Sequence, residues 1–160
     1  MARYHEIPQP DQVTIREKED AMGAYFMMFA TLATGLPLPV LNLIAAIIYF
    51  FINKKKSRFV HFHSLQSLLS QLPTSLLNIG LVAWLIRIIF FDFHFNAYFK
   101  GYLAMVIAAN LIYIIFSIIG AVKARRGEFY YFVFFGRVAY HYAYKEVQVP
   151  SRQSVNQPPK

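Results

Sequence analysis

The histidines and polar side chains of residues 61–78 are the chemically most versatile groups in an otherwise apolar stretch. His61 and His63 form a His-x-His pair, a spacing that binds metals when both rings point the same way. The surrounding pattern is helical, and on a helix the two side chains point about 160° apart. Two such rings do not easily share a metal ion. The sequence therefore predicts no metal site here, and interfacial or hydrogen-bonding roles for both histidines.

The polar side chains of this region fall on one helical face. At 100° per residue they occupy an arc of roughly 140°. This polar stripe consists of His63, Gln66, Ser67, Ser70, Gln71, Thr74 and Asn78. Polar groups find no partner in lipid, so the stripe should face other helices or a water-filled cavity. It could be a hydrophilic lining or client-binding groove, a set of hydrogen bonds between helices, or the wet face of a helix on the membrane surface. We favour hydrogen bonds between helices or a helix on the membrane surface, because Pro73 breaks the helical phase of the stripe.

Patterns that would indicate catalysis or cofactor binding are missing from the sequence. It contains no cysteine, no Gly-rich phosphate loop, no paired carboxylates within the apolar runs and no nucleophile–base arrangement. We therefore expect a non-enzymatic protein with no catalytic residues and no cofactor. Isolated polar residues in the other apolar runs are expected to make hydrogen bonds between helices. They are Asn42, Asn110, Tyr113 and Ser117.

The composition predicts an integral membrane protein. Hydrophobic residues make up 57% of the chain and charged residues 15%, whereas soluble domains carry roughly 25% charged residues. The net charge of +8 comes largely from basic clusters at the ends of apolar runs, where cytoplasmic loops of membrane proteins collect Lys and Arg. The lipid bilayer and other membrane subunits are the expected partners, and nucleic acid is not.

The order of polar and apolar segments predicts an all-α fold with about four membrane helices and a C-terminal aromatic interfacial helix. A flexible tail is expected at 1–13, a single membrane domain at 14–145 and a disordered tail at 146–160. The expected helices lie at about 15–34, 38–52, 59–91 with a kink or break at Pro73, 101–122 and, in the interface, 128–145. The basic loops 53–58 and 123–127 should be cytoplasmic, and residues 92–100 should lie on the opposite side.

The first apolar stretch has two possible folds. Thr14 and Glu17 match a capping box, which predicts a helix start. Residues 21–52 are too long for one straight span, and Gly35–Pro39 suits a tight turn between two short helices. The alternative is one kinked span, which would place the N-terminus on the other side of the membrane.

The C-terminal aromatic segment is unusual. Residues 128–144 contain nine Phe or Tyr residues, and Arg137, His141 and Lys145 recur every four residues, so they share one helical face. A helix in the cytoplasmic interface fits this pattern best. Gly136 interrupts it, which leaves a short membrane-dipping segment as an alternative.

The segment from Lys56 to Leu69, followed by Pro73, resembles the signature of the Tic-twenty-like family. That family includes a channel-forming subunit of the chloroplast inner-envelope protein-import machinery and small bacterial relatives called import-component proteins. Its pattern is a short basic loop followed by S-R-F-V-R-F-(N/H)-x-x-Q-(A/S), an apolar run and a proline. The matching residues are Arg58, Phe59, Val60, Phe62, His63, Gln66, Ser67 and Pro73, and His61 replaces a usual Arg.

This resemblance implies a four-helix membrane subunit with both termini on one side, which acts in protein translocation within a larger complex. Phe59 and Phe62 would anchor the helix start in the apolar layer, while His63 and Gln66 turn inward to polar partners. The alternatives are a structural or assembly subunit of a respiratory, photosynthetic or secretion complex, or a small-solute or ion pore. A bacterial or organelle inner membrane is the expected location.

Overall fold

The computed structural model describes residues 4–29, 39–91 and 94–146, and in these ranges the protein is helical. The helices are α1 (Ile15–Phe26), the short 3-10 turn η1 (Met27–Phe29), α3 (Pro39–Asn53), α4 (Arg58–Phe90), α5 (Ala97–Arg125) and α6 (Phe135–Tyr144). The turn expected at Gly35–Pro39 lies outside the described residues except for its last residue. The tail expected at 146–160 likewise lies outside them, except for Glu146.

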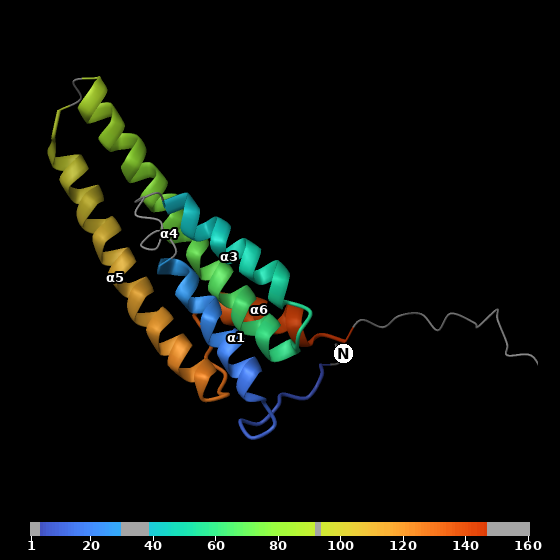
Figure 1. The fold of residues 1–160 in the computed structure, drawn as a ribbon. Coiled ribbons are helices and arrows are strands. Elements are labelled where there is room, and N and C mark those ends of the chain that lie inside the picture. Colours follow the sequence, from blue (N-terminus) through green and yellow to red (C-terminus); the bar gives the residue numbers. More distant parts are fainter. Residues whose placement is uncertain (1–3, 30–38, 92–93, 147–160) are drawn as a thin grey trace, which may run out of the picture.

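The longest elements, α4 and α5, form an antiparallel hairpin that runs the length of the molecule (Figure 1). They contain 33 and 29 residues, or about 50 Å and 44 Å at 1.5 Å per residue. Both are long and apolar enough to cross a membrane, and only 6% of the most apolar stretch of α4 is buried inside the protein. The apolar surface of α4 is therefore available to lipid rather than used for a soluble core.

Of the about four membrane helices expected, the first two of them short, α4 and α5 reach spanning length in the described part of the chain, and α3 is a shorter apolar helix. Helix α1 has 12 residues and α3 has 15, or about 18 Å and 22 Å. Both are shorter than a hydrocarbon core of about 30 Å. They lie against one half of the α4–α5 hairpin and stop well short of its far end (Figure 1).

Helices α1 and α3 run in opposite directions, as in a hairpin. The Tyr49 hydroxyl, near the end of α3, donates a hydrogen bond to the carbonyl oxygen of Asp20 in the first half of α1 (2.8 Å). Lys56, just after α3, forms an ion pair with the Asp20 carboxylate (2.8 Å). These contacts do not fit a single kinked helix. They place the start of α1 and the Lys54–Arg58 loop at the same end of the molecule.

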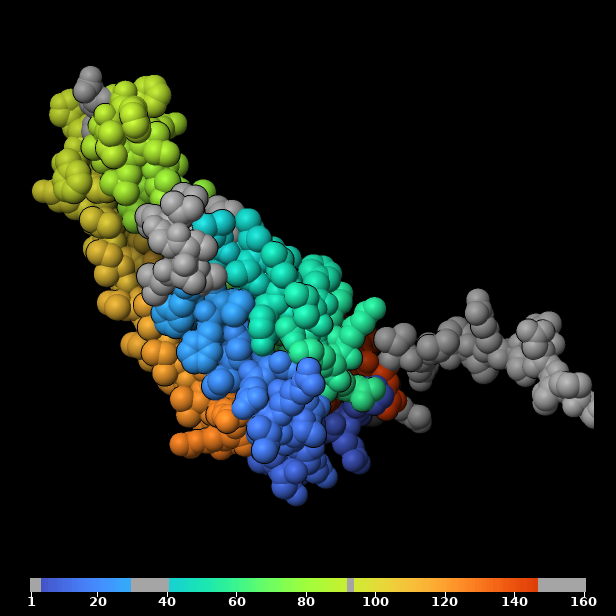
Figure 2. All heavy atoms as spheres, viewed as in Figure 1, coloured from blue at the N-terminus to red at the C-terminus, as the bar shows by residue number. Residues whose placement is uncertain are grey.

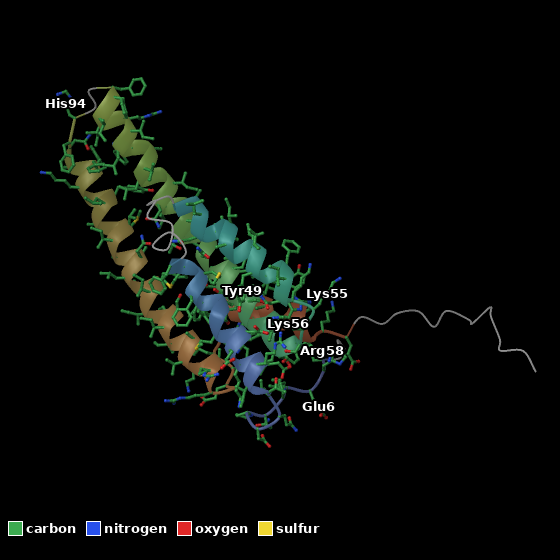
Figure 3. The ribbon with its side chains drawn as sticks, in the orientation of Figure 1. Glu6, Tyr49, Lys55, Lys56, Arg58 and His94 are labelled. Atoms are coloured by element: carbon green, nitrogen blue, oxygen red, sulfur yellow. The ribbon has the colours of Figure 1, made fainter. Side chains whose placement is uncertain are left out.

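Side-chain caps set where the helices begin. Thr14 and Glu17 form the expected capping box at α1. The Ser57 hydroxyl accepts a hydrogen bond from the Val60 N–H at the start of α4, and Asn96 caps α5 in the same way. Lys55, Lys56 and Arg58 consequently lie at one end of the hairpin and His94 at the other (Figure 3).

Helix α4 continues through Pro73, so the expected break does not occur there. Proline removes one backbone donor. Within a bilayer, however, a broken helix would leave several backbone groups without partners, which favours continuity. The Pro73 side chain is exposed and lines a cavity between α4, α5 and residues 132–135.

The segment after α5 departs from the single helix expected at 128–145. Gly127, at φ +79°, ends α5, and its N–H donates to the Ala124 carbonyl. Residues 128–134 are not helical, and α6 begins only at Phe135. Helix α6 then packs on α4 (Figure 1). The structure therefore has a non-helical stretch followed by one short helix in place of the single continuous helix expected.

The core lies at the end of the molecule that carries the basic loops. It joins the N-terminal residues, α1, α4, α5 and the segment after α5, and its buried members are Val13, Ala21, Tyr25, Phe59, Ala121, Ala124 and Phe132. Residues 4–13, where we expected a flexible tail, lie against this core. The His5 N–H donates to the Tyr144 carbonyl at 2.9 Å, so both ends of the described chain meet on one side.

Candidate functional site: the buried polar stripe of α4

The polar stripe lies inside the protein. Six of its seven members are buried and Asn78 is half-buried, and Gln66 and His63 are 0% exposed. The stripe faces α1, α5 and the non-helical segment after α5, so it is not the wet face of a helix on the membrane surface. Its hydrogen bonds show what it does in the fold.

Gln66 completes the backbone hydrogen bonds of the segment 130–132. Its Nε2 donates to the carbonyl oxygen of Tyr130 at 2.8 Å, and its Oε1 accepts from the N–H of Phe132 at 3.2 Å. A backbone N–H can only donate and a carbonyl can only accept, so these two contacts fix the orientation of the amide. The segment has no helical or strand partner of its own, and the Gln66 side chain takes the place of one.

Tyr25 of α1 links two members of the stripe. Gln66 Nε2 donates to the Tyr25 hydroxyl at 2.9 Å, and the same hydroxyl lies 2.9 Å from Nδ1 of His63. With the amide orientation fixed, the hydroxyl accepts from Gln66, and which atom donates between the hydroxyl and His63 Nδ1 depends on the tautomer of the ring. This chain joins α1 to α4 inside the core.

Ser67 supports the end of α1. Its hydroxyl donates to the Ala24 carbonyl at 2.8 Å. Ala24 lies in the last turn of α1, where carbonyl groups have no partner within an α-helix. The remaining hydroxyls of the stripe bond to their own helix: Ser70 to the Ser67 carbonyl and Thr74 to the Gln71 carbonyl.

Asn78 and Asn110 join α4 to α5 near the middle of the hairpin. Each side-chain amide donates to the carbonyl oxygen of the other, at 3.0 and 3.1 Å. The interhelical hydrogen bond expected for Asn110 is therefore present. Tyr113 and Ser117, on the same face of α5, are buried, and the Tyr113 hydroxyl faces Ser117 and the stripe residues Ser67 and Ser70.

Aromatic rings enclose His63. The centroids of Phe59 and Phe62 lie 4.5 and 4.9 Å from the imidazole centroid, and Phe129 packs on all three rings. Phe59 and Phe62 are 2% and 0% exposed. The expectation that they anchor α4 in lipid is therefore wrong. They point into the protein because the segment after α5 covers that face of the helix.

The two histidines and Arg58 take separate roles. His61 points away from His63 and packs against Phe50, with ring centroids 5.6 Å apart. Arg58 Nη2 lies 3.1 Å from Nε2 of His5, so this motif residue contacts the N-terminal segment. Within the described ranges no three His, Cys, Asp or Glu side chains gather in a way that could hold a metal ion.

Sequence reasoning missed the partners of the stripe. Tyr25 lies in an apolar run with no spacing to other polar residues, and the backbone of residues 130–132 carries no side-chain signal at all. The only available signal was the stripe itself, since buried polar groups require partners. It indicated that partners exist but not which residues supply them.

Comparison with known proteins identifies a family. No curated protein and no solved structure matches the chain. A family model, described as the magnetosome magnetite crystal formation protein family (MamF/MmsF), matches residues 19–139. The match extends from α1 into α6 and includes the whole polar stripe.

This match overturns the resemblance to the Tic-twenty-like family and the functions expected from it. The similarity there rested on fourteen residues from Lys56 to Leu69, whereas the family model covers about three quarters of the chain. Protein translocation is therefore not supported, and the family suggests the magnetosome membrane in place of a bacterial or organelle inner membrane. The chain is a membrane protein that belongs to the magnetosome magnetite crystal formation protein family.

Proposed function

We propose that the protein resides in the magnetosome membrane and acts in magnetite crystal formation as a structural membrane component rather than an enzyme. The family match over residues 19–139 carries this proposal. It spans the two candidate membrane helices and the half-length segments packed beside them. The matched region is thus the membrane fold itself.

The hydrogen bonds of the polar stripe support a structural role. The amide of Gln66 and the hydroxyl of Ser67 are bonded to backbone groups of other segments. The hydroxyl of Tyr25 is bonded to two side chains of α4. Groups engaged in this way hold elements together, whereas a catalytic group needs a free atom directed at a substrate.

The distribution of charge supports one orientation in the membrane. Lys55, Lys56 and Arg58 lie at the same end as Arg125 and Arg126, because Arg125 forms an ion pair with Glu19 at the start of α1 (2.9 Å). Basic residues favour the cytoplasmic side. His94 at the opposite end would then face the magnetosome interior (Figure 3). Residues 128–145 would lie within the cytoplasmic half of the membrane and at its interface.

Other membrane proteins of the magnetosome are proposed as further partners. The far half of the α4–α5 hairpin is not covered by α1, α3 or α6 (Figure 1). Its side chains include large exposed apolar residues such as Ile89, Phe90 and Leu111. Lipid or another transmembrane helix would cover them equally well.

The proposal is tested by replacing the gene in a magnetite-forming cell with a fluorescently tagged copy and, separately, by deleting it. We expect the tagged protein in the purified magnetosome membrane and a change in the size or number of crystals, seen by electron microscopy, in the deletion strain. The untagged gene supplied in trans should restore normal crystals. Normal crystals in the deletion strain, or a tagged protein absent from magnetosomes, would overturn the proposal.

A further inference from the structure

Two segments of the protein extend only part of the way along the spanning hairpin, and both lie at the basic end. The first is the α1–α3 pair, whose helices are about 18 Å and 22 Å long. The second is the segment 128–144, which leaves the end of α5, passes Gln66 and returns as α6 to Tyr144. Tyr144 meets His5 close to the start of α4, so the segment begins and ends at the same level.

The turning point of the segment 128–144 lies well inside the expected hydrocarbon layer. Phe132 donates its N–H to Gln66, which is eight residues, or about 12 Å, along α4 from Arg58. Its ring also packs against Phe116 of α5, with centroids 6.0 Å apart. Phe116 is seven residues, or about 10 Å, from Lys123. The distances along α4 and along α5 therefore place the turning point at the same depth from the basic end.

The residues at this turning point face outward. Val133 and Phe134 are 72% and 77% exposed. Phe134 also adopts φ +67° and ψ −55°, at the centre of a strained γ-turn that the Phe135 N–H closes by donating to the Val133 carbonyl at 2.9 Å. Two large apolar side chains held outward at this depth are directed at lipid chains. The segment is therefore inserted in the bilayer rather than resting on its surface.

The protein consequently has a larger cross-section in one half of the membrane than in the other. At the basic end α1, α3, α6 and the segment 128–134 pack beside the hairpin, whereas of the described residues only those of α4 and α5 and their connection lie at the His94 end (Figure 1). The space-filling view shows the same broad and narrow ends (Figure 2). We propose that the protein is a membrane wedge that prefers, and stabilises, bilayers that are convex toward its basic end.

The partner of this wedge is a convex, anionic lipid leaflet. In such a leaflet the headgroups are spread apart, so inserting extra protein volume on that side relieves packing stress. The exposed basic side chains at this end add attraction to anionic headgroups. They include Lys55, Arg58 and Arg126, whereas Lys56 and Arg125 are already paired with Asp20 and Glu19. The inference depends on the shape and charge of the chain and not on its part in magnetite formation.

The test follows how the full-length protein distributes between giant vesicles and membrane tubes pulled outward from them. Because the chain has no cysteine, single cysteines can mark orientation. An impermeant dye added outside labels Arg126→Cys only when the basic end faces out, and His94→Cys only when it faces in. We expect a tube-to-vesicle ratio above one for labelled Arg126→Cys and below one for labelled His94→Cys, relative to a lipid dye. Equal ratios, or the reverse order, would overturn the wedge.

A second comparison assigns the effect to the inserted segment. Val133→Glu with Phe134→Glu places charges at the turning point, where they are costly in the hydrocarbon layer. Both side chains are exposed, so the fold should persist, which gel filtration checks. Tyr142→Glu is the control, because this exposed residue lies near the return of α6 to the interface. We expect the double variant to lose part of the enrichment and the control to keep it. Full enrichment in the double variant would overturn the contribution of this segment.

Discussion

Gln66 and Tyr130 are 64 residues apart in sequence, yet the side-chain amide of the first lies 2.8 Å from the backbone carbonyl oxygen of the second. The same amide accepts from Phe132, so one side chain completes two backbone groups of a segment that is neither helix nor strand. Irregular backbone at membrane depth is tolerated only where protein groups satisfy it. The polar stripe of α4 would therefore allow this non-helical segment to enter the bilayer, as the proposed wedge requires.

The first prediction concerns Gln66→Leu. The change leaves the buried Phe132 N–H without a partner, at a cost of about 1–3 kcal/mol, and also removes the bond to the half-buried Tyr130 carbonyl. We expect a lower thermal unfolding midpoint in mild detergent and less protein in the membrane. Ser64→Ala is the matched control, since the Ser64 hydroxyl bonds only to carbonyls of its own helix. If both variants unfold at the same temperature, Gln66 does not hold the segment.

The second prediction concerns the Asn78–Asn110 pair, which tests the register of the spanning hairpin. Asn78→Leu or Asn110→Leu alone leaves the other side-chain amide without its hydrogen-bond partner. We expect each single variant to lower the unfolding free energy by about 1–2 kcal/mol. The double variant should lose less unfolding free energy than the two single variants together, because no unpaired amide remains. Equilibrium unfolding of the three variants gives the coupling energy. Strict additivity would show that the amides do not interact.

The third prediction concerns acid stability at the start of α1. Burial raises the pKa of Glu17, but hydrogen bonds from the Thr14 hydroxyl and N–H outweigh it and hold the pKa below its ordinary value. A lowered pKa in the folded state stabilises the protein above the unfolded value of 4.5, and this contribution is lost as the pH falls through the folded value.

Thr14→Ala should therefore destabilise the protein by about 0.5–2 kcal/mol near neutral pH, since it also removes the helix cap. The difference from the parent should shrink as the pH falls below 4.5. Unfolding midpoints measured across that range test this. A stability difference between parent and variant that stays constant down to acid pH would mean that ionisation of Glu17 does not stabilise the capping box.

The fourth prediction concerns topology, and isolated magnetosomes provide the test. Arg126→Cys should react with an impermeant thiol reagent on intact vesicles, whose outer surface is cytoplasmic. His94→Cys should react only after detergent is added. Both residues are exposed, so accessibility within the protein does not limit either reaction. Labelling of His94→Cys on intact vesicles would contradict the orientation.

Particular residues show how much of this fold could be predicted from the sequence. The capping box at Thr14, the start of α4 after the Lys-rich loop and the spanning length of α5 follow from local patterns. The non-helical path of residues 128–134 does not, because its aromatic spacing suits a helix and only contact with Gln66 favours another conformation. Such a contact between distant residues leaves no mark in local sequence.

In the candidate site, too, some features could be predicted from local sequence and others depend on contacts between distant residues. The stripe on α4 could be predicted because polar residues at helical spacing are conspicuous in an apolar run. The inward direction of Phe59 and Phe62 could not, since it depends on Phe129 covering that side of the helix. A fourteen-residue resemblance suggested another family, and only a match over residues 19–139 identified the right one.

If the polar stripe holds the segment 128–144 inside the bilayer, residue 134 lies among the lipid chains, and its depth can be measured. A fluorophore on Phe134→Cys, in the otherwise cysteine-free full-length chain, is compared with one on Tyr142→Cys in vesicles whose lipids carry quenchers at mid-chain or at the headgroup. We expect the mid-chain quenchers to act more strongly on residue 134 and the headgroup quenchers to act more strongly on residue 142. Adding Gln66→Leu should move residue 134 toward the headgroups. Headgroup-level quenching of residue 134 in the unaltered background would contradict the claim.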